Sequence, residues 1–194
     1  QGFRNWSTMN TLVLTFDPLT LLPQLWLDAS DAATLFTDTA GTTPVSAGDD
    51  PVARINDKSG NGKHAFQATE ALCPLYKTNV KNGLSTVRFN GSTQHMASTE
   101  DLVIPSCTIF CVFRLNDVPG EDALVIDATD GSDIVLYFSA TTNTRLHLAD
   151  NSGGLHGIYN NAGTAGFVAE DTFAQFTGIV SNGDWRLRKN GGSQ

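Results

Sequence analysis

One stretch, DKSGNGKH at residues 57–64, decides how this chain folds. Its two glycines permit positive φ angles, and its Asp, Ser and Asn side chains can hydrogen-bond to neighbouring backbone amides. This composition is typical of a tight connection between two strands. We therefore predict a structural turn that depends on five residues: Asp57, Ser59, Gly60, Asn61 and Gly62.

Two other blocks stand on either side of this turn, LWLDASD at residues 25–31 and VRFNG at residues 87–91. In this order the three blocks resemble the laminin-G-like members of the concanavalin A-like lectin/glucanase superfamily. The resemblance begins at about Leu22 and implies an antiparallel jelly-roll β-sandwich of the kind found in phage virion proteins and bacterial surface proteins. The family usually has a Trp two residues before the Asp of the turn. This chain has Ile55 there, so we expect an aliphatic core contact in place of an aromatic one.

The hydrophobic pattern has a period of two along most of the chain, which predicts an all-β fold. Turns rich in Gly, Asn, Asp and Ser separate the expected strands, which cover residues 52–56, 86–90, 107–115, 122–128, 133–139, 145–148, 173–181 and 185–188. A short helical pattern covers residues 31–36. Residues 40–51 are the best candidate for a long polar loop.

The domain organisation that we expect is an N-terminal strand or arm at residues 1–22, followed by a laminin-G-like jelly-roll domain at residues 23–194. Residues 11–16 are expected to form a leading strand that packs on its own sandwich; the alternative is an arm that adds to another subunit's sheet edge. The strand around Trp185 runs into an Asn-Gly turn near the end of the sequence, so we expect the sandwich to continue in a longer polypeptide. Its open edge should be covered by the 11–16 strand, by a neighbouring subunit or by residues that follow.

The charge balance limits the partners. The chain has 12 Lys and Arg residues against 20 Asp and Glu residues, a formal charge of −8. The negative electrostatic field of such a chain repels phosphate backbones, so we expect no nucleic-acid partner. No segment approaches the ~18 apolar residues of a membrane span, so we expect no membrane insertion.

The three cysteines are expected to be free. Cys107 and Cys111 lie about 13 Å apart along one strand, which is too far for a disulfide. They share a face with Ile109 and Phe113, so we expect buried thiols that act as small hydrophobic groups. No Cys or His spacing fits a structural zinc. A chain without disulfides fits folding in the reducing cytoplasm of a host.

Catalysis is the less favoured interpretation. Glucanases on this fold carry an acid and a nucleophile that alternate along one strand. The nearest acidic strand here, EDALVID at residues 121–127, has Leu124 and Ile126 where the second acid would be needed. None of the four histidines has a nucleophile partner in the sequence. We therefore expect no catalytic residues and no enzymatic activity.

The segment DATDGSD is the candidate calcium site, because it places three carboxylates, those of Asp127, Asp130 and Asp133, within one hairpin turn. The segment lacks the EF-hand order, and Asp-Gly turns are common without metal. A hairpin with solvent-facing acids is the favoured interpretation. We therefore expect no cofactor, with bound calcium as the alternative.

A sugar-binding rim needs an exposed aromatic side chain together with amides and carboxylates that can satisfy neighbouring hydroxyls. Residues 150–161 supply this mixture best. A flexible loop rich in Gly and Asn is the alternative for the same segment. The candidate carbohydrate-binding residues are Asp150, Asn151, His156, Tyr159 and Asn160.

Taken with the resemblance, these patterns favour a non-catalytic jelly-roll module on a virion surface, such as a phage capsid-decoration, fibre or tail component. It would serve assembly and adhesion to host glycans, with other virion or surface subunits as partners in an oligomeric assembly. The alternatives are an extracellular glycoside-active enzyme and a secreted bacterial carbohydrate-binding module. The fold alone does not choose between these functions.

Overall fold

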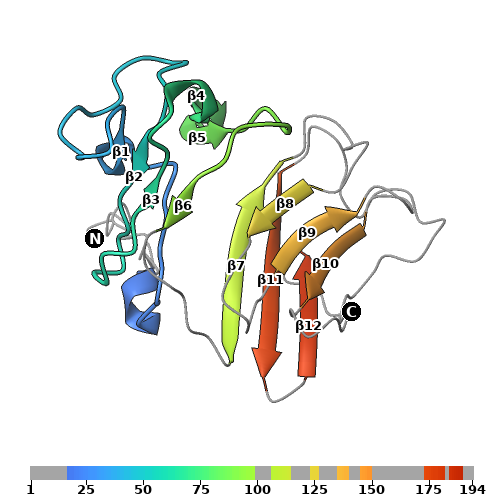
Figure 1. Ribbon diagram of the computed structural model, residues 1–194. Helices are drawn as coiled ribbons and strands as arrows, with labels where there is room; N and C mark the ends of the chain where they lie inside the picture. The colour runs from blue at the N-terminus through green and yellow to red at the C-terminus, as the bar shows by residue number, and fades with distance from the viewer. Residues whose placement is uncertain are drawn as a thin grey trace, which may run out of the picture.

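Antiparallel strands make up most of the regular structure (Figure 1). The computed structural model describes residues 17–98, 106–114, 123–126, 135–139, 145–149, 173–181 and 184–189. Among these residues the helices are short 3₁₀ turns: η1 (Pro18–Leu21), η2 (Ala32–Thr34) and η3 (Glu70–Leu72). The predicted all-β fold is therefore confirmed.

The first part of the chain forms a four-stranded sheet and a separate hairpin (Figure 1). The sheet has the order β1-β2-β3-β6 and consists of β1 (Leu35–Phe36), β2 (Arg54–Ile55), β3 (Ala65–Phe66) and β6 (Ala97–Ser98). The hairpin consists of β4 (Leu75–Lys81) and β5 (Leu84–Arg88). A two-residue turn closes it, and both of its residues have positive φ, 51° at Asn82 and 79° at Gly83. Positive φ at both positions characterises the type I′ turn, which matches the natural twist of two paired strands.

Two three-stranded sheets follow. One has the order β12-β11-β7 and consists of β7 (Cys107–Phe113), β11 (Ala174–Ser181) and β12 (Asp184–Lys189). The other has the order β10-β9-β8 and consists of β8 (Ala123–Ile126), β9 (Val135–Ser139) and β10 (Arg145–Ala149). These strands occupy the segments in which the sequence pattern predicts them.

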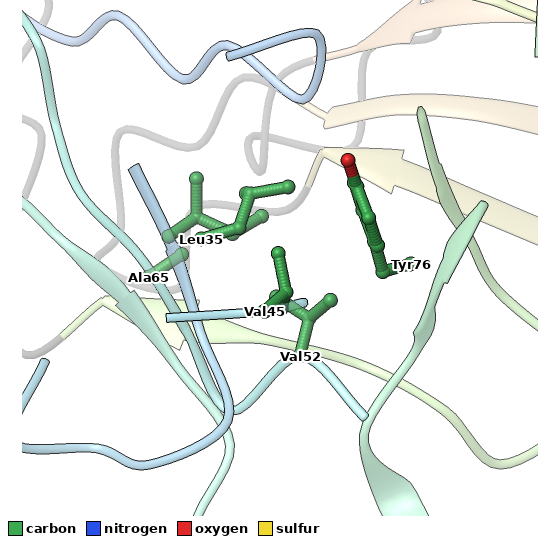
Figure 2. Close-up of a cluster of buried hydrophobic side chains, with 6 residues drawn as sticks. Leu35, Val45, Val52, Ala65 and Tyr76 are labelled. Carbon is green, nitrogen blue, oxygen red and sulfur yellow. The ribbon is translucent and has the colours of Figure 1, made fainter. Parts of the chain in front are cut away.

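A hydrophobic cluster joins the first sheet to the hairpin (Figure 2). Ile55, which stands where the family usually has Trp, is 7% exposed in this cluster, so the expected aliphatic contact is confirmed. Val45 also belongs to this cluster, so one residue of the predicted polar loop at residues 40–51 is buried in the core. The cluster consists of Leu35, Val45, Val52, Ile55, Ala65 and Tyr76.

The sheet β12-β11-β7 has one covered face. Phe176 on β11 is 1% exposed, and its ring stacks on Phe113 of β7 with 4.7 Å between the ring centroids. Cys107 and Cys111 alternate with exposed residues and share this inner face, as predicted, although both are only partly buried. All three cysteines are free, and the loop cysteine Cys73 is the one that is fully buried.

Two local predictions need correction. The helical pattern at residues 31–36 gives one 3₁₀ turn, after which Leu35–Phe36 becomes strand β1 because it pairs with Ile55 and Arg54 of β2. Strand β4 was not predicted, because its polar residues hide the period of two. Its partner β5 begins two residues earlier than the predicted strand at 86–90.

The N-terminal strand predicted at residues 11–16 lies outside the described residues. Among the described strands, β12 pairs only with β11, so what covers its second edge stays a prediction. No helix in the described ranges is both long and apolar enough to cross a bilayer.

Candidate functional site

The predicted turn, called here the Asp57 turn (residues 57–64), connects β2 to β3. The Asp57 carboxylate organises it: Oδ1 accepts from the Ser59 N–H at 2.9 Å, and Oδ2 accepts from the Ser59 hydroxyl at 2.7 Å and from the Lys63 N–H at 3.1 Å. Gly60 and Gly62 have φ of 89° and 76°, the conformation that glycine adopts without strain. The chain thus turns tightly between β2 and β3, and the Asp57 carboxylate holds the turn together.

The same carboxylate also reaches a distant segment, residues 23–31, called here the Trp26 ribbon. Asp57 Oδ1 accepts from the Trp26 N–H at 2.9 Å, and the Lys58 N–H donates to the Trp26 carbonyl at 2.8 Å. The Asn61 amide nitrogen donates to the carbonyls of Pro23 and Gln24, at 3.0 and 3.1 Å. The first and second sequence blocks are therefore one structural unit.

The environment of Asp57 favours its charged form. Partial burial raises the pKa of this carboxyl, but the hydrogen bonds from Ser59, Trp26 and Lys63 outweigh it, so the net pKa is below the ordinary value. A carboxylate whose lone pairs are occupied in this way is a structural acceptor, and it is not available to take a proton from a substrate.

Lys58 adds an ion-pair cluster beside the turn. Its Nζ lies 2.9 Å from Asp28 and 2.8 Å from Asp31, and 4.5 Å from the centre of the Trp26 ring. The hydrogen bond to Asp31 is the main cause of a raised Lys58 pKa, so the ammonium stays charged. Both carboxylates are thus engaged by Lys58, and the cluster stabilises the ribbon.

The third sequence block also has a structural role. Asn90 Oδ1 accepts from the backbone N–H groups of Ser92, Thr93 and Gln94 at 3.0 to 3.1 Å, which forms a compact Asx turn after β5. Val87 packs against the hydrophobic cluster. The three blocks that carry the family resemblance therefore build the scaffold.

A small polar group lies near η3. Gln67 Nε2 lies 3.1 Å from Nε2 of His95 and donates to the His95 carbonyl, while Cys73 Sγ points to the Gln67 carbonyl at 3.5 Å. Burial raises the pKa of the Cys73 thiol, which keeps it protonated. A protonated thiol is a poor nucleophile, so this group serves packing.

The outer face of the sheet β12-β11-β7 has the chemistry of a contact surface. Phe110 and Val112 on β7 are 60% and 67% exposed, although both are large and apolar. Register places Phe110, Thr177 and Arg188 in one row across the sheet, and Arg186 lies in the neighbouring row. We call this surface the Phe110 face. The sequence signal for the Phe110 face is that every residue of β7 after Thr108 is apolar. In a strand with one exposed face, apolar residues usually alternate with polar ones.

The predicted ligand sites fall elsewhere in the chain. The calcium candidates Asp127, Asp130 and Asp133 lie outside the described residues. The same holds for the carbohydrate candidates Asp150, Asn151, His156, Tyr159 and Asn160. Within the ranges that are described, no three His, Cys, Asp or Glu side chains gather closely enough to hold a metal ion.

Comparison with known proteins gives no relative: no protein-family model, curated protein or solved structure matches the chain.

Proposed function

We propose that this chain is a non-catalytic jelly-roll module displayed on a virion surface, where it assembles with neighbouring subunits and adheres to host glycans. The laminin-G-like resemblance of the three sequence blocks supports the jelly roll and the virion setting. In the structure, Asp57 joins the first two of these blocks into one unit.

The assembly role is carried by one observation, the exposure of Phe110 and Val112 side by side on β7. Burying a large apolar side chain contributes about 1.5–3 kcal/mol, so leaving two of them in water is unfavourable unless a partner covers them. Strand β7 is also an edge strand among the described strands, and an edge strand can pair with a strand of another chain.

The partner that fits this surface is a second copy of the chain. Arg188 places positive charge on the Phe110 face, whereas the whole chain has a formal charge of −8. The basic face of one copy is therefore complementary to the acidic remainder of the next. This is a head-to-tail contact, which extends into rings or arrays such as those of a particle surface.

The experiment measures the mass of the purified chain in solution by light scattering coupled to size-exclusion chromatography. The wild type should have a mass above the 20.7 kDa of one chain. The double variant Phe110→Ser/Val112→Thr should shift to the monomer, and Arg188→Glu should weaken the assembly, as should added salt.

Leu22→Ser is the matched control, because Leu22 is 83% exposed and lies far from this face in the sequence. It should leave the mass unchanged. A wild type that is monomeric at every concentration contradicts the assembly role, and so does an oligomer that the Phe110→Ser/Val112→Thr variant retains.

A further inference from the structure

An open hollow of about 330 Å³ lies where the β4–β5 hairpin meets the Trp26 ribbon. Ser85 holds the two segments together, because its hydroxyl donates to the carbonyls of Ala29 and Ser30 at 3.0 and 3.2 Å. The hollow is lined by Ser30, Tyr76, Thr78, Asn79, Gly83, Leu84 and Ser85.

Tyr76 is the unusual member of this lining. It is only 8% exposed, and its ring packs with the hydrophobic cluster. In Figure 2 its hydroxyl lies at the end of the ring that is away from Val52. Within the described part of the chain this hydroxyl makes no hydrogen bond, although the Tyr76 backbone N–H and carbonyl are both paired. Buried tyrosine hydroxyls usually have a partner, since a buried hydroxyl without one is costly.

The other walls also offer unused hydrogen-bonding groups. Thr78 lies two residues after Tyr76 on β4, and Asn79 follows with φ of 54°. Neither side chain donates or accepts a hydrogen bond in the described part of the structure. Asn79 presents a carbonyl oxygen and two N–H groups, and Thr78 presents a hydroxyl.

The lining selects a chemical class of ligand. None of the described lining residues carries a charge, so an ion or a strongly charged group would find no counter-charge among them. Hydroxyl and amide groups on several sides suit a neutral molecule with several hydroxyls, and Leu84, 53% exposed, offers apolar surface for C–H groups. The volume is at the small end of ligand sites, which are roughly 300–1,000 Å³.

We infer that this hollow, called here the Tyr76 hollow, binds one neutral sugar residue, and that the Tyr76 hydroxyl hydrogen-bonds to it. The inference rests on the adhesive part of the proposed function, for which it names a site and a ligand class. The site is separate from residues 150–161, where the sequence places its carbohydrate candidates.

Nuclear magnetic resonance titration of the ¹⁵N-labelled chain tests the inference. The probes are the methyl glycosides of glucose, galactose, mannose and N-acetylglucosamine, each added separately. At least one should shift the amide signals of Ser30, Thr78, Asn79 and Ser85 in a saturable way. Tyr76→Phe should weaken that binding about tenfold or more, because it removes one buried hydrogen bond to the ligand.

Two further measurements keep the result decisive. Without sugar, Tyr76→Phe should have an unchanged or higher melting temperature, since the hydroxyl has no partner to lose among the residues that the structure describes. Tyr159→Phe, the matched Tyr→Phe change in residues 150–161, should bind sugar as the wild type does.

Three outcomes would overturn the inference: no shifts with any probe, equal binding by wild type and Tyr76→Phe, or a lower melting temperature for Tyr76→Phe without sugar. Loss of binding in Tyr159→Phe alone would move the site to residues 150–161. None of these outcomes affects assembly through the Phe110 face, which the mass measurement tests independently.

Discussion

The backbone N–H of Asp57 donates a hydrogen bond to Nδ1 of His64 across 3.0 Å. Nδ1 can accept only when it carries no proton, so the hydrogen of the neutral ring is on Nε2. The His64 ring also meets Phe66 edge-on, with 6.1 Å between the centroids. This bond therefore ties the first residue of the Asp57 turn to its last one.

Replacing His64 tests the strength of that bond. His64→Ala should lower the free energy of unfolding by about 1 kcal/mol, because the Asp57 N–H loses its acceptor. His64→Asn should lose less, since its side-chain oxygen can occupy the place of Nδ1. Urea unfolding of the three proteins near neutral pH measures the difference, and an unchanged stability of His64→Ala would contradict a contribution from this bond.

Replacing Asp57 should have a larger effect. Asp57→Ala removes the acceptor of the Trp26, Ser59 and Lys63 N–H groups and should lower the free energy of unfolding by on the order of 3 kcal/mol. The free energy of unfolding of Asp57→Asn should lie between those of the wild type and Asp57→Ala. The amide oxygen of Asn can still accept, but its NH₂ group cannot accept from the donors that face Oδ2.

The contribution of Asp57 should also depend on pH. Its folded pKa is below the ordinary value of 3.8, so its contribution is fully present above pH 3.8 and is lost as the pH falls through the folded pKa. The stability gap between wild type and Asp57→Ala, measured by urea unfolding, should therefore narrow in strong acid. A gap that stays constant from neutral pH down to about pH 2 would contradict the assigned role.

Substitution by Ala can distinguish a turn glycine with positive φ from a glycine without it. Gly62 has φ of 76° and open space around the position of a Cβ, so Gly62→Ala should cost about 1 kcal/mol from backbone strain alone. Gly48→Ala is the control, because its Cβ would make an ordinary 3.6 Å contact with Thr78. Thermal unfolding should show a lower melting temperature for Gly62→Ala only; a comparable drop for Gly48→Ala would argue against the strain.

Alkylation should report on the burial of the thiols. Burial raises the pKa of Cys111 to about 11 from an ordinary 9.0, which lowers its thiolate fraction at mildly alkaline pH by about a hundredfold. Burial also raises the pKa values of Cys73 and Cys107. Iodoacetamide labelling followed by peptide mass mapping should therefore be slow at all three in the folded protein and fast in guanidinium chloride. Rapid labelling of Cys111 in the folded protein would contradict this.

Period-two patterning predicted the longer strands of the second part because their alternation extends over several residues. Strands β1, β3 and β6 have two residues each, too few for any pattern, and they form because tertiary neighbours pair with them. Strand β4 could have been found, since Asn82-Gly83 is a strong hairpin signal that lies directly between β4 and β5.

The candidate sites also differ in how much of them could be predicted from the sequence. The hydrogen bonds within residues 57–64 could be predicted because they are local. The contact of Asp57 with Trp26 spans 31 residues, and no local pattern encodes it. The Tyr76 hollow combines side chains from β4, β5 and the Trp26 ribbon, so only the folded arrangement brings them together.

The long span between the Trp26 ribbon and the Asp57 turn has a consequence during protein synthesis. Residues 23–31 leave the ribosome before their partners exist, because Asn61 follows Pro23 by 38 positions. At roughly 5–20 residues per second, this delay is about 2 to 8 seconds. The turn between β2 and β3 can close from its own residues as soon as it emerges, and the ribbon docks onto it afterwards. Until then the Trp26 side chain is open to chaperones and to other nascent chains.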